Sequence, residues 1–188
     1  MKLKVDGKIF LKDIELNSAQ TVFDLINSCR EYLGEWLSWV EETLQLNDTI
    51  LYIHSVSGRD LFNGRYVFEV WYQNNLAGLI DFHCGDKINK SVEIGYWLGE
   101  NYQGKGIMTR ACTACIKYAF TKLDFNRIVI KCALGNVKSQ AIPKRLNFKF
   151  EGVEREGPII NYRFNDLMIF SMLKKEWPLS GSLNVPVD

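Results

Sequence analysis

The sequence has little of several features that would point to particular classes of protein. Its 23 basic and 22 acidic residues leave a formal net charge of +1, which gives no sign of a broad nucleic-acid surface. No apolar run reaches the roughly 18 residues that a membrane-spanning helix needs. The N-terminus, MKLKVDGKIFLKDIEL, alternates charged and apolar residues and lacks the apolar region of a signal peptide. We therefore expect a cytoplasmic protein that binds neither nucleic acid directly nor a membrane.

Cysteines are also few, and their pattern is not that of a disulfide framework. There are five: Cys29, Cys84, Cys112, Cys115 and Cys132. An odd number without an export signal argues against structural disulfides. Cys112-Thr-Ala-Cys115 is a CxxC, but no second pair stands at zinc-ribbon spacing, and the pair falls inside a helical stretch. We expect buried packing residues there, and no metal site.

What is present is the alternation of a single α+β domain. Hydrophobic residues make up 47% of the chain, which is ordinary for a globular protein. Apolar periodicity and turn residues predict, in order, a strand (9–16), a Ser18-capped helix (22–33), short helices (35–40 and 48–56), a loop (58–64), three antiparallel strands (65–72, 76–84, 92–98), a long helix (104–122), a buried strand (127–133), a helix capped by Asn136 (to 146) and two final strands (148–153, 167–173). Residues 1–177 form the domain, and 178–188 a peripheral tail.

A glycine-rich stretch, GENYQGKGIMT at 99–109, lies between a predicted strand and the long helix. It resembles a mononucleotide P-loop, but Gly106 stands where the Mg²⁺-binding Ser or Thr belongs. The dinucleotide fingerprint fails at its third glycine, where Thr109 stands. The turn still directs free backbone N–H groups and the positive helix end toward an anion, and Gly104 and Gly106 allow a diphosphate to approach closely.

The same stretch resembles the pyrophosphate loop Q/R-x-x-G-x-G/A of the GNAT superfamily of acyl-CoA-dependent N-acetyltransferases. GYWLGENYQGKGIMTRA, ALGNVKSQAIPKRLNFKFEG and NSCREYLGEWLSWVEET together resemble its RimJ/RimL branch, named for acetylation of ribosomal-protein N-termini. The resemblance spans about residues 10–175 and implies a mixed, mostly antiparallel sheet of about seven strands flanked by helices. It departs from the motif at the last small position, which is Met108.

By this resemblance, acetyl-CoA is the co-substrate and no metal is needed. The loop residues implied to hold its diphosphate are Gln103, Gly104, Lys105, Gly106, Ile107, Met108 and Thr109. The backbone of Trp97 and Leu98 would bind the pantetheine arm or the thioester oxygen. Asn136 would hydrogen-bond the pantetheine amide.

The resemblance also suggests catalytic residues. Glu93, on the strand that leads into the loop, matches a general base of several members, although an ordinary surface glutamate fits as well. Glu156 is the second candidate, but Pro158 occupies the position that aligns with that base. Pro143 stands where many members have a tyrosine acid, which leaves Ser139 as the group near the sulfur. Its other interpretation is helix capping beside Asn136.

Other polar and aromatic residues support weaker hypotheses. The side chains that could line the acceptor site or attract a cationic acceptor are Asp81, His83, Trp36, Trp39, Trp71, Glu41 and Glu42. Lys144, Arg145, Lys174 and Lys175 could contact the coenzyme 3′-phosphate or simply be solvated.

Three functions therefore compete. The first is acetylation of a protein N-terminal α-amine, of the ribosomal-protein type. An α-amine has a pKa of about 7.7–8.0 against about 10.4 for lysine, so it needs only modest help from a base. The second is acetylation of a small amine such as a polyamine, antibiotic or amino-acid derivative. The third is a noncatalytic acyl-CoA-binding protein. The sequence does not identify the acceptor, and a homo-oligomer is left open.

Overall fold

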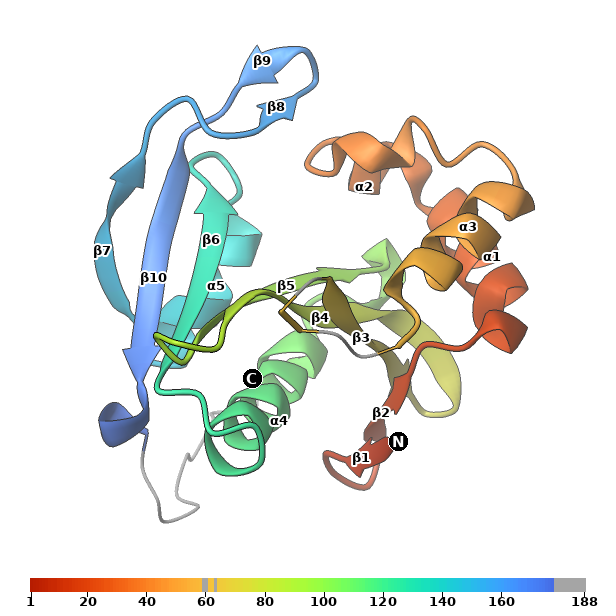
Figure 1. Ribbon diagram of the computed structural model, residues 1–188. Coiled ribbons are helices and arrows are strands. Elements are labelled where there is room, and N and C mark those ends of the chain that lie inside the picture. Colours follow the sequence, from red (N-terminus) through yellow and green to blue (C-terminus); the bar gives the residue numbers. More distant parts are fainter. Residues whose placement is uncertain (59–60, 63, 178–188) are drawn as a thin grey trace.

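The computed structural model describes residues 1–58, 61–62 and 64–177. Its centre is an eight-stranded sheet in the order β1-β2-β3-β4-β5-β6-β10-β7, in which every neighbouring pair is antiparallel except β5 and β6 (Figure 1). The strands are β1 (Lys2–Lys4), β2 (Ile9–Asp13), β3 (Arg65–Tyr72), β4 (Asn75–Asp86), β5 (Ser91–Leu98), β6 (Arg127–Ala133), β7 (Lys149–Glu154) and β10 (Leu167–Leu173). A separate hairpin consists of β8 (Ile159–Ile160) and β9 (Arg163–Phe164).

Helices cover both faces of this sheet. They are α1 (Ala19–Ser28), α2 (Arg30–Gly34), α3 (Leu46–Val56), α4 (Ile107–Thr121) and α5 (Val137–Arg145), with short 3-10 turns η1 (Leu16–Ser18), η2 (Ser38–Val40), η3 (Glu100–Tyr102) and η4 (Lys174–Glu176). Helix α4 lies against one face, and α1 to α3 lie on the other side (Figure 1). None of the helices in the described ranges has the length and apolar character that crossing a bilayer demands.

Strand alternation separates two apolar cores. Along β3, Tyr66, Phe68 and Val70 belong to the core under α4, whereas Val67, between Tyr66 and Phe68, belongs to the core under α1 and α3. The predicted packing role of Cys112 and Cys115 is confirmed, because both side chains are fully buried in the α4 core.

The predicted α+β fold is confirmed, and the differences lie in details. Strand β1 was not predicted, so the main sheet has eight strands where about seven were expected, and the separate β8–β9 hairpin was not predicted either. The predicted helix over 22–33 is interrupted at Cys29, whose φ of −144° and ψ of 35° are not helical. Ser18 does not cap α1 through its side chain, because its own backbone is already helical, in η1. The predicted tail at 178–188 lies outside the described residues.

Candidate active site

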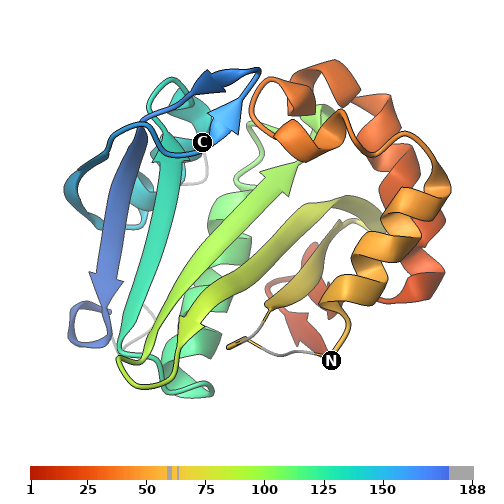
Figure 2. The same cartoon turned by 45° about the horizontal axis from the view of Figure 1, so that its top comes forward.

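A gap opens in the middle of the sheet, between β5 and β6. The parallel ladder of these strands covers only Ser91 to Glu93, whereas β5 stays paired with β4 as far as Leu98. The strands lie together at one end and separate toward the other, with α4 visible between them (Figure 2). In the described ladders, the edge of β5 from 94 to 98 that faces β6 therefore lacks a strand partner. Its main-chain groups can bond an extended ligand.

On its other side this edge is held firmly by β4. A Cβ added to Gly78 would lie only 2.2 Å from the carbonyl oxygen of Trp97. Any residue but glycine would push the two strands apart at that point. The backbone of Trp97 is thus fixed from behind, with its free edge toward the gap.

The glycine-rich turn lies at one end of the gap and begins α4. Gly104 and Gly106 both adopt left-handed backbone conformations, with φ of 69° and 63°, which glycine adopts without strain. Gly106 is the N-cap of α4, and no side chain caps the helix. Its first N–H groups and the positive end of its dipole are therefore available to an anion. Gln103 adds a buried Nε2 donor that has no partner among the described residues.

Hydrogen bonds from two basic side chains hold this turn in place. The Arg110 guanidinium donates to the carbonyl oxygens of Lys105 (3.0 Å) and Gly106 (3.2 Å), and it pairs with Asp6 at 2.6 Å. Lys105 Nζ itself donates to the carbonyl of Asn101 at 2.7 Å. Lys105 is the one predicted loop residue that does not line the adjoining cavity.

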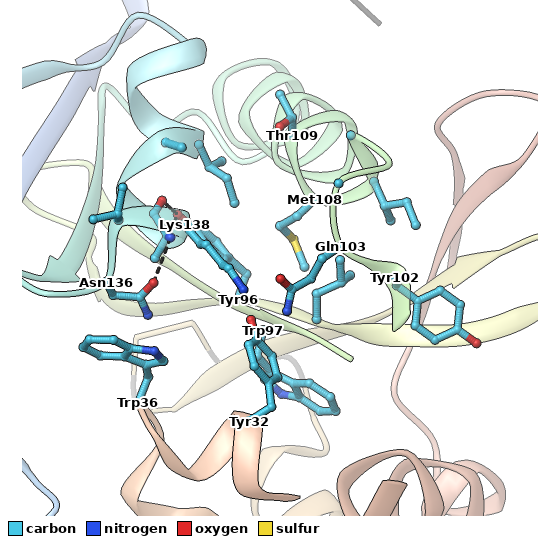
Figure 3. Close-up of a pocket in the computed structure, with 18 of the residues that line it drawn as sticks. Tyr32, Trp36, Tyr96, Trp97, Tyr102, Gln103, Met108, Thr109, Asn136 and Lys138 are labelled. Carbon is cyan, nitrogen blue, oxygen red and sulfur yellow. Dashed lines mark hydrogen bonds between the residues drawn. The ribbon is translucent and has the colours of Figure 1, made fainter. Parts of the chain in front are cut away.

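A cavity of about 750 Å³ runs from this turn along the open edge of β5 toward α2. The predicted residues that line it are Trp97, Leu98, Gln103, Gly104, Gly106, Ile107, Met108, Thr109, Asn136 and Ser139. Figure 3 shows Gln103 and Met108 on one side and Asn136 on the other, with Tyr32 of α2 and Trp36, which follows α2, approaching from a third. We call this the coenzyme cavity, because its donors and shape fit a diphosphate joined to an extended arm.

A hydroxyl cluster lies beside Asn136. Asn136 Oδ1 accepts a hydrogen bond from Ser139 N at 2.9 Å, so the predicted helix cap is confirmed. The Ser139 hydroxyl lies 3.2 Å from Cys132 Sγ and 3.4 Å from the Tyr96 hydroxyl, which donates to the Ser139 carbonyl at 2.9 Å. Burial raises the pKa of Tyr96 well above its usual range. Although Pro143 excludes a tyrosine acid from α5, β5 supplies a protonated phenol to the same region, which sequence reasoning missed.

On the opposite sheet face, charged side chains alternate across the strands. Arg65 pairs with Asp81 (3.1 Å), Asp81 with His83 (2.6 Å), and His83 with Glu93 (3.6 Å). Glu93 then pairs with Lys131 (3.4 Å), which also reaches Glu154 (3.0 Å). We call these six residues the charge chain. It crosses from β5 to β6 where their ladder ends.

The charge chain determines which of its members are ionised. Burial alone would lower the pKa of His83, but the contacts with Asp81 and Glu93 outweigh it and raise that pKa to about 9. The contact with His83, and then Lys131, lowers the pKa of Glu93 despite its partial burial. Glu93 is thus a carboxylate between two cations near neutral pH. It lines neither cavity directly.

His83, Cys84 and Glu93 also form a group whose potential metal-ligand atoms lie within 4.8 Å of one another. These residue types suit a transition metal such as Zn²⁺. In this structure Asp81 contacts the His83 ring and Lys131 contacts the Glu93 carboxylate. A metal would have to compete with these ion pairs.

A second cavity, of about 430 Å³, lies between the sheet and helices α1 and α3. Trp97 lines both cavities and therefore lies between them. Among the other predicted acceptor residues, Trp39, Glu42 and Asp81 line this second cavity, and Trp36 lines the coenzyme cavity. We call the second space the α3 cavity.

The remaining candidates lie apart from both cavities, except Arg145, which lines the coenzyme cavity. Glu156 is exposed, and its backbone N–H donates to Asp166 at 2.9 Å. Trp71 stacks on Phe10, with ring centroids 5.9 Å apart. Of the other lysines, Lys144 Nζ donates to Gln140 (3.3 Å) and Lys174 Nζ to Asp124 (2.8 Å).

Comparison with known proteins identifies relatives of this architecture. The chain is 37% identical to the Bacillus subtilis (strain 168) protein named "Putative ribosomal N-acetyltransferase YdaF", over 93% of this chain and 96% of that protein. It is 28% identical to the ribosomal-protein-serine acetyltransferase of Escherichia coli (strain K12), over 91% of this chain and 96% of the other. Among solved structures, the microcin C7 self-immunity acetyltransferase MccE, in complex with acetyl-CoA and AMP, is 32% identical. It superposes with a TM-score of 0.85 over 90% of this chain and 94% of its own.

The family model for the acetyltransferase (GNAT) domain matches residues 8–149, which include the open edge of β5, the glycine turn and α5. This match confirms the membership of the GNAT superfamily that the glycine loop predicted. The chain belongs to the GNAT family of acetyltransferases.

Proposed function

We propose that this enzyme transfers the acetyl group of acetyl-CoA to the α-amine at the N-terminus of a protein, of the type found on ribosomal proteins. The observation that carries the proposal is the coenzyme cavity, which joins an anion-binding turn to the open edge of β5. The names of the B. subtilis and E. coli relatives support the acceptor class. A cytoplasmic location, the absence of nucleic-acid contact and the oligomeric state stay predictions.

The residues around the coenzyme cavity fit acetyl-CoA. Gly104, Gly106 and the start of α4 would hold the diphosphate through backbone N–H groups, and the orphan Gln103 Nε2 would donate to it as well. Asn136 Nδ2 is the amide donor that would meet the pantetheine arm. None of these contacts requires a metal ion. Acetyl-CoA supplies the thioester carbonyl carbon that the acceptor amine attacks.

We assign the proton transfers to residues at the two ends of β5. Glu93, ionised within the charge chain, would attract the ammonium group and accept its proton through a relay water. This weak base suits an α-amine, a fraction of which is already neutral near pH 7. At the other end, the hydroxyls of Ser139 and Tyr96 would donate toward the departing sulfur.

A direct assay tests the proposal. The protein is incubated in EDTA with acetyl-CoA and N-terminal peptides of ribosomal proteins, and mass spectrometry locates the added acetyl group. Spermidine and amino sugars serve as competing acceptors. The proposal predicts acetylation at the peptide α-amine and equal rates with and without EDTA. Turnover restricted to the small amines would refute it in favour of the second hypothesis, and a failure to acetylate any of these amines would contradict both.

A further inference from the structure

The α3 cavity has features of a binding site for a side chain, and nothing in the proposed chemistry uses it. It adjoins the coenzyme cavity across Trp97, on the sheet face that carries Glu93 and Asp81. An acceptor whose amine reaches the open edge of β5 from this face therefore has its first residues beside the α3 cavity. The inference rests on the proposed function, since it takes the acceptor to be a peptide.

The walls of the cavity suit an apolar stem. Val22 and Ile26 of α1 and Leu79 of β4 line it on the helix and sheet sides. Trp39 and Trp97 form an aromatic wall, with ring centroids 6.0 Å apart and planes tilted by 55°. Aromatic faces also attract a cation that lies over them, and more strongly when water is excluded.

The polar groups of the cavity favour a positive tip on that stem. Three carboxylates line it, from Glu42, Asp48 and Asp81, against one guanidinium, that of Arg65. Arg65 is already paired with Asp81 at 3.1 Å. Asp48 accepts from the backbone N–H groups of Leu44 and Gln45, which leaves Glu42 as the carboxylate without a side-chain partner among the described residues. The excess of negative charge would repel an acidic side chain.

A buried polar atom gives independent support for a ligand. Thr49 is 2% exposed and lines the cavity, yet its Oγ1 has no hydrogen-bond partner among the described residues. Leaving a buried hydroxyl unsatisfied is unfavourable, and a ligand that forms a hydrogen bond with it would remove that cost. A guanidinium, with five N–H donors, can bond Thr49 and a carboxylate together.

We infer that the α3 cavity selects acceptors that carry a basic side chain, best an arginine, within their first two residues. The stem would lie against Trp39 and Trp97, and the guanidinium would meet Glu42 and Thr49. Selectivity for the acceptor and binding of acetyl-CoA are then properties of two separate cavities with one shared wall.

The test compares peptides that differ only in charge. Two pairs are used, Arg-Ala- against citrulline-Ala- and Ala-Arg- against Ala-citrulline-, all without lysine, because citrulline keeps the shape of arginine and removes the charge. In one of the pairs, kcat/KM for the arginine peptide should exceed that for the citrulline peptide by about tenfold. Glu42→Gln should bring this ratio close to one while the acetyl-CoA KM stays unchanged. Thr49→Val should lower it less.

Glu41→Gln is the matched control, because the neighbouring Glu41 lines neither cavity and instead contacts the Tyr162 hydroxyl at 3.4 Å. It should leave the ratio as it is in the unmodified enzyme. If both pairs are acetylated at the α-amine with ratios near one, the inference is wrong while the proposed function stands. If no peptide is acetylated, the proposed function fails, and the inference fails with it.

Discussion

The two cavities on either side of Trp97 are built in opposite ways. The coenzyme cavity takes most of its polar contacts from backbone, in the turn at 103–109 and along one edge of β5. The α3 cavity takes its polar contacts from side chains on η2, α3, β3 and β4 and the turns beside them. A site made of contiguous backbone keeps one ligand class, whereas a site made of dispersed side chains can change its ligand with a few substitutions. This is the division expected when one co-substrate is constant and the acceptor varies.

The largest effect should come from Glu93, on the acceptor side. Glu93→Gln should lower kcat by at least about 10²-fold, the lower end of the range for a general acid or base. Acetyl-CoA affinity, measured by calorimetry, should survive. The loss should shrink as pH rises, because more of the acceptor amine is then already neutral.

Glu154→Gln is the control for this comparison. Glu154 is the other carboxylate that pairs with Lys131, at 3.0 Å, so its loss perturbs the charge chain without touching the base. Its kcat should stay close to that of the unmodified enzyme. A near-normal kcat of Glu93→Gln at pH 7 would contradict the assignment of Glu93 as the base and make Glu156 the next candidate.

The second effect concerns stability and again belongs to the acceptor side. The pKa of His83 is raised to about 9 from an ordinary value near 6.5, so its protonated form stabilises the fold. That contribution is complete below about pH 6.5 and is lost as pH rises through about 9. We expect the free energy of unfolding, measured with urea, to fall by on the order of 2–3 kcal/mol more in the unmodified protein than in His83→Gln between these pH values. Parallel pH curves for the two proteins would contradict this.

The third and smallest effect belongs to the coenzyme side. Gly106→Val puts a β-branched residue at φ 63° in the turn that lines the coenzyme cavity. A left-handed backbone costs such a residue about 1–2 kcal/mol or more, and the turn must then shift. The acetyl-CoA KM should rise about tenfold, with the preference among peptides unchanged.

Gly152→Val separates coenzyme crowding from general strain. Gly152 also has a positive φ, of 153°, but lies in β7 with no atom within 4 Å of an added Cβ. It should lower stability and leave the acetyl-CoA KM alone. Equal changes in the acetyl-CoA KM from both substitutions would show that the glycine-rich turn does not depend on glycine at position 106.

The sequence predicts well those structures whose contacts join residues that are close together in the chain. The turn around Gly104 and Gly106 combines a motif with its neighbours in the chain, and the cap at Asn136 bonds a residue three positions away. Element order follows for the same reason, since apolar periodicity is a local signal. The predicted helix over 22–33 shows the limit of this signal. Its apolar periodicity continues through Cys29, but the backbone of Cys29 is not helical and α1 ends at Ser28.

The acceptor side could not be predicted in this way because its contacts join distant segments. The sequence makes Glu93 a candidate base, but its partners His83 and Lys131 come from neighbouring strands, and strand pairing decides that they meet. The Tyr96 hydroxyl was missed because its partner Ser139 is 43 residues away. When strand register decides which side chains meet, the residues next to them in the sequence do not reveal the contact.

The open edge of β5 also bears on how the protein avoids sticking to itself. An unpaired strand edge is a template on which other chains can add a strand and begin to aggregate. Here the edge lies inside the sheet, and the turn between β8 and β9 reaches across to the segment after α2, where Asn161 donates to the carbonyl of Glu35 at 3.2 Å (Figure 2). The position of this edge inside the sheet thus leaves it open to a ligand while hindering the addition of a whole strand from another chain.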